Sequence, residues 1–378
     1  MSDGYTTAEN STKAPAGENR AAALNFPCSG CGSQMAFDPD TQELKCSHCG
    51  RLEPIPAPLM EAPEYLYDPR TDAYEAPDWD TMGGRSVQCK GCGAQTVIPA
   101  EDTTSVCPFC GSHYVVDDTG APGIMPESLM PFKVSKEKAL QQFRTWVKKR
   151  FWAPRAFKKR SHRTEELTGI YVPFWTYDAE LYTTYSGEIG KDYTVTRTRV
   201  VNGKTQTYTT THTRWYPVSG NDAVTFDDRL LCATDRLDTG MIQKLGAFST
   251  KVLNRYSPSF LAGFAAQRYT IGVGEGWQKA SQSMQRDMED RIVSSLHGDH
   301  HRNMVYQHNF SNVRFKHILL PVWLSSYTYK EKVYRFMING ETGRLEGKAP
   351  VSVLKVLAAI GIGLAAILAL YFLLYYFR

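Results

Sequence analysis

The spacing of apolar and polar side chains divides the chain into segments of different character. Residues 1–24 are small and polar without periodicity, which is typical of a disordered tail. Beyond residue 131, apolar positions recur three and four residues apart and predict a helix from an N-cap at Ser135 to about Phe151. A second helix is expected over residues 275–296. Their apolar faces are formed by Ala139, Leu140, Phe143, Trp146 and Val147, and by Trp277, Met284, Met288, Ile292 and Leu296.

Residues 191–216 predict a long hairpin with Asn202-Gly203 as a type I′ turn. A two-residue turn at this point pairs Thr198 with Thr207, Thr196 with Thr209, Thr194 with Thr211, Arg197 with Tyr208, and Tyr193 with His212. Both faces are then polar, so we expect the hairpin to project from its domain. It is either a solvated arm or an arm whose strand edges receive a partner strand.

Further strands are expected over residues 313–338, where β-branched and aromatic side chains are frequent. A glycine-containing turn at 339–343 leads to a short last strand. The hydrophobic pattern as a whole therefore predicts an α+β fold, rich in β-structure, over residues 131–350.

The last part of the chain, residues 351–378, is hydrophobic. Its segment Val356–Phe377 holds 22 residues without a charge, a length of about 33 Å as a helix, enough to cross a bilayer. Basic residues lie on the near side, at Arg344, Lys348 and Lys355. By the positive-inside tendency they predict a single-pass, tail-anchored protein with its bulk in the cytoplasm. A stripe of small residues offers a packing face for another transmembrane helix, or reflects composition alone: Gly361, Ala365 and Ala369.

Eight of the nine cysteines lie in four C-x-x-C pairs, and these pairs form an internal repeat. The second unit repeats the first, and a glycine follows each pair. Two such knuckles, separated by the length of a short hairpin, close one tetrahedral zinc site. We therefore expect two structural zinc ions, one in each of two zinc ribbons at residues 25–52 and 86–118. The predicted ligands are Cys28, Cys31, Cys46 and Cys49, then Cys89, Cys92, Cys107 and Cys110.

Charge separates these ribbons from the rest of the chain. Residues 1–130 carry 7 basic and 19 acidic side chains, whereas residues 131–378 carry 36 and 20. Acidic, proline-rich residues 53–85 connect the ribbons, and residues 119–130 form a second linker. The first linker is either solvated or an aromatic-studded strip that docks on a basic surface. Since phosphate binding draws on clusters of Lys and Arg, acidic ribbons favour docking of proteins over nucleic acid.

A basic segment, residues 148–163, holds eight cationic side chains and no acid. Aromatic residues interleave with them. Three interpretations stay open: single-stranded nucleic acid, the anionic leaflet of a membrane, or solvated charges around aromatic core residues. The membrane anchor favours the second over the first. The cationic residues are Lys148, Lys149, Arg150, Arg155, Lys158, Lys159, Arg160 and Arg163.

Catalytic motifs are missing from the sequence. Gly203-Lys204-Thr205 resembles the end of a phosphate-binding loop, but position 198 is Thr where that motif requires Gly. No G-x-S-x-G or H-E-x-x-H occurs, and the closed cysteine sites leave no position for a reacting water. We therefore expect a protein that is not an enzyme.

Longer phrases carry a resemblance to a bacterial family. These are GIYVPFWTYDAELYTTYSGEIG, HTRWYPVSGN, LLCATDRL, YSPSFLAGFAAQRY and VRFKHILLPVWLSSYTYKEKVYRFMINGETG, together with the paired knuckles. Family members are often labelled primosomal protein N′, superfamily II helicase, or TFIIB-type zinc ribbon protein. The helicase label does not fit this chain, which lacks a Walker A motif and a helicase core. The family is similar to membrane-anchored partners of SPFH/band-7 and PspA-like proteins in membrane-stress systems.

This resemblance implies a tail-anchored adaptor that recruits such cytoplasmic proteins to the membrane. The alternative is a nucleic-acid-binding zinc-ribbon protein associated with replication. The formal charge of +4 hides an acidic front and a basic rear, and we expect the front to fold back on the rear until a partner competes for it.

Overall fold

The computed structural model describes residues 26–33, 35–56, 63–69, 84–88, 94–99, 104–106, 109, 113–115, 124, 126–160, 167–201, 204–250, 253–266, 269–329 and 332–376. Several sequence predictions lie outside these residues. They concern the tail at 1–24, the second cysteine quartet (Cys89, Cys92, Cys107 and Cys110), the turn at Asn202-Gly203, Arg163, and the side chains of Lys159 and Arg160.

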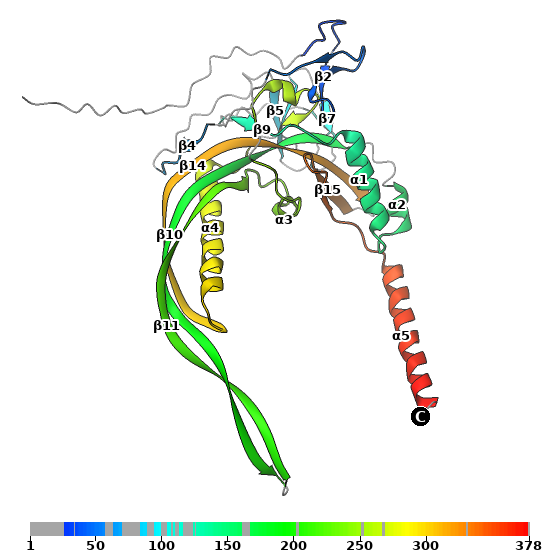
Figure 1. Cartoon of the computed structure of the whole chain (residues 1–378). Coiled ribbons are helices and arrows are strands. Elements are labelled where there is room, and N and C mark those ends of the chain that lie inside the picture. Colours follow the sequence, from blue (N-terminus) through cyan, green and yellow to red (C-terminus); the bar gives the residue numbers. More distant parts are fainter. Residues whose placement is uncertain are drawn as a thin grey trace, which may run out of the picture.

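Three long strands form the framework of the molecule. β10 (Thr168–Val201) pairs antiparallel with β11 (Lys204–Cys232) on one side and with β14 (His300–Tyr329) on the other. Figure 1 shows these strands as one strongly curved ribbon, from which the tip of β10 and β11 projects as a two-stranded arm. β15 (Lys332–Asn339) and β16 (Leu345–Gly347) extend the sheet beside the C-terminal part of β14.

Short strands complete this sheet and two smaller ones. β9 (Ser128–Leu129) joins β14 and β12 (Asn254–Arg255), while β13 (Ala265–Ala266) joins β10 and leads to β6 (Gln95–Pro99) and β5 (Gly84–Gln88). A separate three-stranded sheet holds β1 (Met35–Asp38), β2 (Glu43–Cys46) and β3 (Leu52–Glu53). β7 (Thr104–Val106) pairs with β8 (His113–Val115). The fold is thus α+β and mostly sheet, as the sequence predicts.

The two predicted helices are present. α1 (Lys136–Lys149) has Ser135 at its N-cap, although the serine side chain makes no capping hydrogen bond. α4 (Val273–Ser295) begins two residues before the expected start and lies along the concave side of the curved sheet (Figure 1). Their predicted apolar faces contribute buried residues to the core: Ala139, Phe143 and Val147 from α1, and Met284, Met288 and Ile292 from α4. Three shorter elements are α2 (Arg155–Arg160), α3 (Thr239–Lys244) and the 3-10 turn Pro258–Leu261.

The core surrounds the first part of β10, where helices cover both faces of the sheet. Tyr171 packs in a cluster with α1, and Ile170 and Val172 lie in a second cluster with α3. Farther along, Trp175 and Tyr177 pack against α4, and their polar atoms donate to backbone carbonyls of Ile271 and Val273 at 2.8 and 2.7 Å. Both faces are therefore apolar here, so this segment lacks simple polar–apolar alternation.

The predicted hairpin is the distal part of this much longer pair of strands. Its register is as expected: Thr194, Thr196 and Thr198 lie opposite Thr211, Thr209 and Thr207, and Tyr193 lies opposite His212. β14 stops pairing with β10 at Gly190. Beyond that point β11 is the only strand that pairs with β10 among the described residues, although Asp192 still bonds to Asp299 and His300. The sequence thus located the free arm correctly but not the buried strand pair that supports it.

Part of the acidic linker docks on the sheet. β4 (Tyr65–Leu66) pairs antiparallel with β14 at Arg314 and Phe315, and Tyr67 N–H donates to Val313 O at 2.9 Å. Tyr65 lies 5.9 Å from Phe315 and Tyr67 lies 5.8 Å from Trp277, measured between ring centroids. Of the two interpretations of the linker, docking describes residues 63–69.

Candidate metal centre and membrane-spanning helix

Two tight turns position the first cysteine quartet. Gly32 N–H donates to Cys28 O, and Gly50 N–H donates to Cys46 O, both at 2.9 Å. Gly32 and Gly50 have φ values of 71° and 76°, a left-handed conformation that glycine adopts without a steric penalty. This is the physical reason for the glycine after each of these two C-x-x-C pairs. The turns direct the sulfur atoms of one pair toward those of the other pair.

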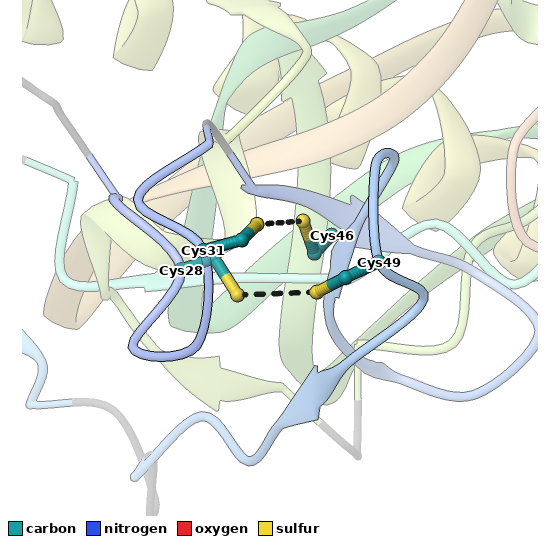
Figure 2. Close-up of side chains that lie close together, drawn as sticks. All are labelled: Cys28, Cys31, Cys46 and Cys49. Carbon is teal, nitrogen blue, oxygen red and sulfur yellow. Dashed lines mark hydrogen bonds between the residues drawn. The ribbon is translucent and has the colours of Figure 1, made fainter.

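Figure 2 shows the four side chains converging from the two turns. The sulfur of Cys28 lies 3.6 Å from that of Cys49, and the sulfur of Cys31 lies 3.5 Å from that of Cys46. All four sulfur atoms lie within 4.8 Å of one another. A tetrahedral zinc–thiolate site with bonds of about 2.3 Å has sulfur–sulfur edges of about 3.8 Å. The residues present therefore fit one metal ion with four sulfur ligands.

Hydrogen bonds shift the pKa values of two thiols of the quartet in opposite directions. Hydrogen bonds from the side chain and backbone of Ser33 lower the pKa of Cys31 to about 6. At Cys49 the Arg51 backbone N–H lowers the pKa, but hydrogen bonds with the other three cysteines raise it to about 12. A thiolate among other thiolates is repelled by them, so Cys49 retains its proton, whereas the hydrogen bonds from Ser33 favour the thiolate at Cys31. A bound cation would remove this repulsion and favour deprotonation of all four.

The quartet is joined to the large domain. Cys28 and Cys46 are buried, whereas Cys31 and Cys49 are exposed. Phe37, between the two turns, donates its backbone N–H to Ala262 O at 2.9 Å and packs edge-on against Phe260 at 5.4 Å between ring centroids. Gln42 adds a hydrogen bond of 2.8 Å to Phe132 O. The metal centre therefore shares a core with β10 and α1.

A second cluster of potential ligands was not expected from the sequence. Oxygen atoms of Glu64, Asp178 and Asp228 lie within 4.8 Å of one another. Lys316 forms ion pairs with Glu64 at 3.2 Å and with Asp228 at 2.6 Å. Burial raises the pKa of Asp178 to about 6, against a backbone hydrogen bond from Asp228 that lowers it. Because a lysine ammonium already lies among the carboxylates, we interpret this cluster as an ion-pair network that fixes the docked linker.

The C-terminal helix α5 (Val353–Tyr376) has the properties expected of a membrane span. It holds 24 residues, reaches a mean hydropathy of 2.6, and buries none of that window against the protein. Figure 1 shows it beginning just below α2 and extending away from the domain. Gly361, Ala365 and Ala369 lie on it, and a Cβ added at Gly361 would meet nothing within 4 Å. By length and composition α5 can cross a membrane.

The described members of the basic segment lie near the start of this helix. Lys148 and Lys149 end α1, Arg150 follows it, and Arg155 and Lys158 belong to α2. Lys158 Nζ donates to Lys148 O at 3.1 Å, so this ammonium group caps the end of α1. The sequence showed the charge of the segment, but not the hydrogen bonds that join Phe151 and Ala153 to Lys355 in the first turn of α5.

Comparison with known proteins gives one informative relative. The chain is 31% identical over 336 residues to the uncharacterized protein YdjG of Bacillus subtilis (strain 168), covering 89% of this chain and 92% of that protein. No family model matches the sequence. No solved structure matches it. At this identity and coverage, the chain belongs to the same protein family as the uncharacterized YdjG.

Proposed function

We propose that this protein is a membrane-anchored adaptor without enzymatic activity. In this proposal α5 crosses the bilayer and the rest of the described chain lies in the cytoplasm. The cysteine quartets bind two structural zinc ions, and the zinc-bearing front docks a cytoplasmic protein of the SPFH/band-7 or PspA-like type. The observation that carries the proposal is α5, an apolar helix with none of its spanning window buried, joined to a body that holds a four-sulfur site.

The metal centre supports a docking role rather than a catalytic one. Four sulfur ligands complete a tetrahedron and leave no position for a reacting water. Zinc is the ion that suits four thiolates in this geometry without redox chemistry. In addition, Cys31 and Cys49 lie at the surface, so the turns that hold the metal are accessible to a partner.

Charge supports a protein partner over nucleic acid. The front of the chain, residues 1–130, carries 19 acidic and 7 basic side chains. Four thiolates and one Zn²⁺ add further negative charge at each site. Such a surface repels phosphate and favours a basic protein surface.

Recruitment to vesicles tests the proposal. The full-length chain is reconstituted into phospholipid vesicles, and a purified PspA-like protein or an SPFH protein from the same genome is added before flotation. We expect the added protein to float with loaded vesicles and not with empty ones, and to be lost when Cys31 and Cys49 are both replaced by serine. A conservative control, Ser47→Ala in the same turn region, should retain it.

Three outcomes would contradict parts of the proposal. If the full-length chain does not float, the anchor is wrong. If the chain floats but neither added protein follows it, the adaptor role is wrong. Salt-sensitive binding of single-stranded DNA would favour the alternative function instead.

A further inference from the structure

The turn between α1 and α2 is bonded to the first turn of α5. Lys355 Nζ donates to the carbonyl oxygens of Phe151 and Ala153 at 2.7 and 2.8 Å. Ser352 N–H donates to Trp152 O at 2.8 Å. The ammonium group of Lys355 also lies 5.4 Å from the centroid of the Phe151 ring. Three hydrogen bonds thus fix the position of this turn along the axis of α5, next to the start of its apolar part.

Large apolar side chains are exposed at that level. Phe151 is 70% exposed and Trp152 is 44% exposed, although the two rings touch edge to face at 5.3 Å between centroids. Val353 and Leu354, in the first turn of α5, are 71% and 82% exposed. Tryptophan is enriched at the membrane–water interface, and tryptophan and phenylalanine occur together on the apolar face of segments that lie in that interface. In water, the same side chains would form an unfavourable apolar patch.

Cationic side chains flank Phe151 and Trp152 in the chain. Lys148, Lys149, Arg150 and Arg155 are exposed, and none forms an ion pair with another residue of the described chain. Arg150 lies over the Trp146 ring, 4.4 Å from its centroid. Lys158 and Lys355 are already engaged with backbone carbonyls. The four exposed cations therefore remain to interact with an external anion.

We infer that the segment Lys148–Arg155 and the first turn of α5 form a collar that binds the anionic phospholipid surface of the membrane crossed by α5. Phe151 and Trp152 enter the headgroup region, and the four exposed cations lie against lipid phosphates. This inference rests on the proposed membrane anchor. It adds that the body of the protein is held against the bilayer, rather than hanging freely from its helix.

Quenching of tryptophan fluorescence by brominated acyl chains tests the collar. The full-length chain is reconstituted into phosphatidylcholine vesicles with or without about 30% phosphatidylglycerol, an anionic lipid of the kind that attracts basic segments. Because α5 contains no tryptophan, the helix itself contributes no quenchable tryptophan signal. We expect quenching that is stronger with phosphatidylglycerol and is reduced in Trp152→Phe.

Charge reversal separates lipid attraction from simple proximity. Lys148→Glu combined with Lys149→Glu should reduce quenching in anionic vesicles to the level of neutral ones. A matched control with the same change in net charge, Lys136→Glu with Arg286→Glu, lies outside the collar and should leave quenching unchanged.

The outcomes distinguish the collar from the anchor. If the chain floats with vesicles but the fluorescence of Trp152→Phe is quenched as strongly as that of the original chain, the collar is wrong and the anchor stands. Equal quenching of tryptophan fluorescence in the two charge-reversal variants would also overturn the collar. If the chain does not float at all, both the anchor and the collar are wrong.

Discussion

The two ends of the long strand β10 have the same secondary structure but opposite surroundings. Near its start, a region that we call the base, Ile170 to Trp175 are buried, with side chains of α1, α3 and α4 covering them. Near its tip, Tyr193 and Val200 are 45% and 69% exposed, and within the part of the chain that the structure describes only β11 pairs with this segment. Backbone pairing is therefore equally regular at both ends, while hydrophobic burial stabilises only the first. Long strands alone do not show which part of a sheet carries stability.

Trp175→Ala should have the largest effect on this contrast. Its indole is fully buried, donates to Ile271 O at 2.8 Å and lies 4.8 Å from the His317 ring. Removing it leaves a cavity and an unpaired carbonyl, so the free energy of unfolding should fall by about 3–5 kcal/mol. Urea unfolding followed by circular dichroism in detergent would measure this loss. A change below about 1 kcal/mol, within the range of a surface substitution, would mean that the base is not the stable part.

Cys46→Ser should be next, because it acts on the base through the candidate metal centre. Cys46 is 1% exposed and belongs to the same buried cluster as Tyr171 and Phe37. We expect loss of one bound metal ion by elemental analysis, together with a fall of about 2–4 kcal/mol in unfolding free energy, less than the total for an isolated zinc finger. Cys232→Ser, at a cysteine outside the quartets, should retain the metal. Unchanged metal content in Cys46→Ser would refute the four-sulfur site.

The carboxyl group of Glu127 predicts that the stability of the buried region depends on pH. Its carboxylate accepts from His317 N–H at 2.7 Å, and burial raises its pKa to about 8 from 4.5. Between pH 4.5 and about 8, the folded protein thus retains a proton on Glu127 that the unfolded chain has already lost. Stability should fall as pH rises through this window, by at most about 1.4 kcal/mol per pH unit.

Glu127→Gln imitates the protonated form and should make this pH profile flatter. The measurement is the urea midpoint at several pH values, compared between the variant and the original chain. Glu180→Gln, at an exposed carboxylate of β10, serves as the control and should leave the slope unchanged. A variant with the original slope would show that Glu127 titrates normally.

Local patterns allowed correct predictions where neighbours in the sequence determine the structure. The assumption of a two-residue turn gave the register of the flanking strands, the apolar spacing after Ser135 located α1, and the paired cysteines indicated a four-sulfur site. Each depends on residues close in the chain, or on one ligand chemistry. Mixed α+β class followed from the same patterns.

Long-range contacts could not be predicted in this way. Tyr65 pairs with Phe315, and Lys355 bonds to Phe151 and Ala153, across separations that no local period records. Asp228, with a φ of 50°, lies near an irregularity in the pairing of β10 and β11. That bulge helps to assemble the acidic cluster around Lys316. The spacing of Glu64, Asp178 and Asp228 in the sequence did not predict this cluster.

The tip of the arm should show the smallest effect. Tyr208 is 47% exposed and lies opposite Arg197, so Tyr208→Ala should change the free energy of unfolding by less than about 0.5 kcal/mol. A two-stranded ribbon that buries no face is marginally stable in water, and its opening need not disturb the base. Amide hydrogen exchange should accordingly be much faster over residues 193–200 than over 170–177. Equal protection of the two segments would contradict this view, because it would require a partner strand on the arm or a cooperative unit that includes it.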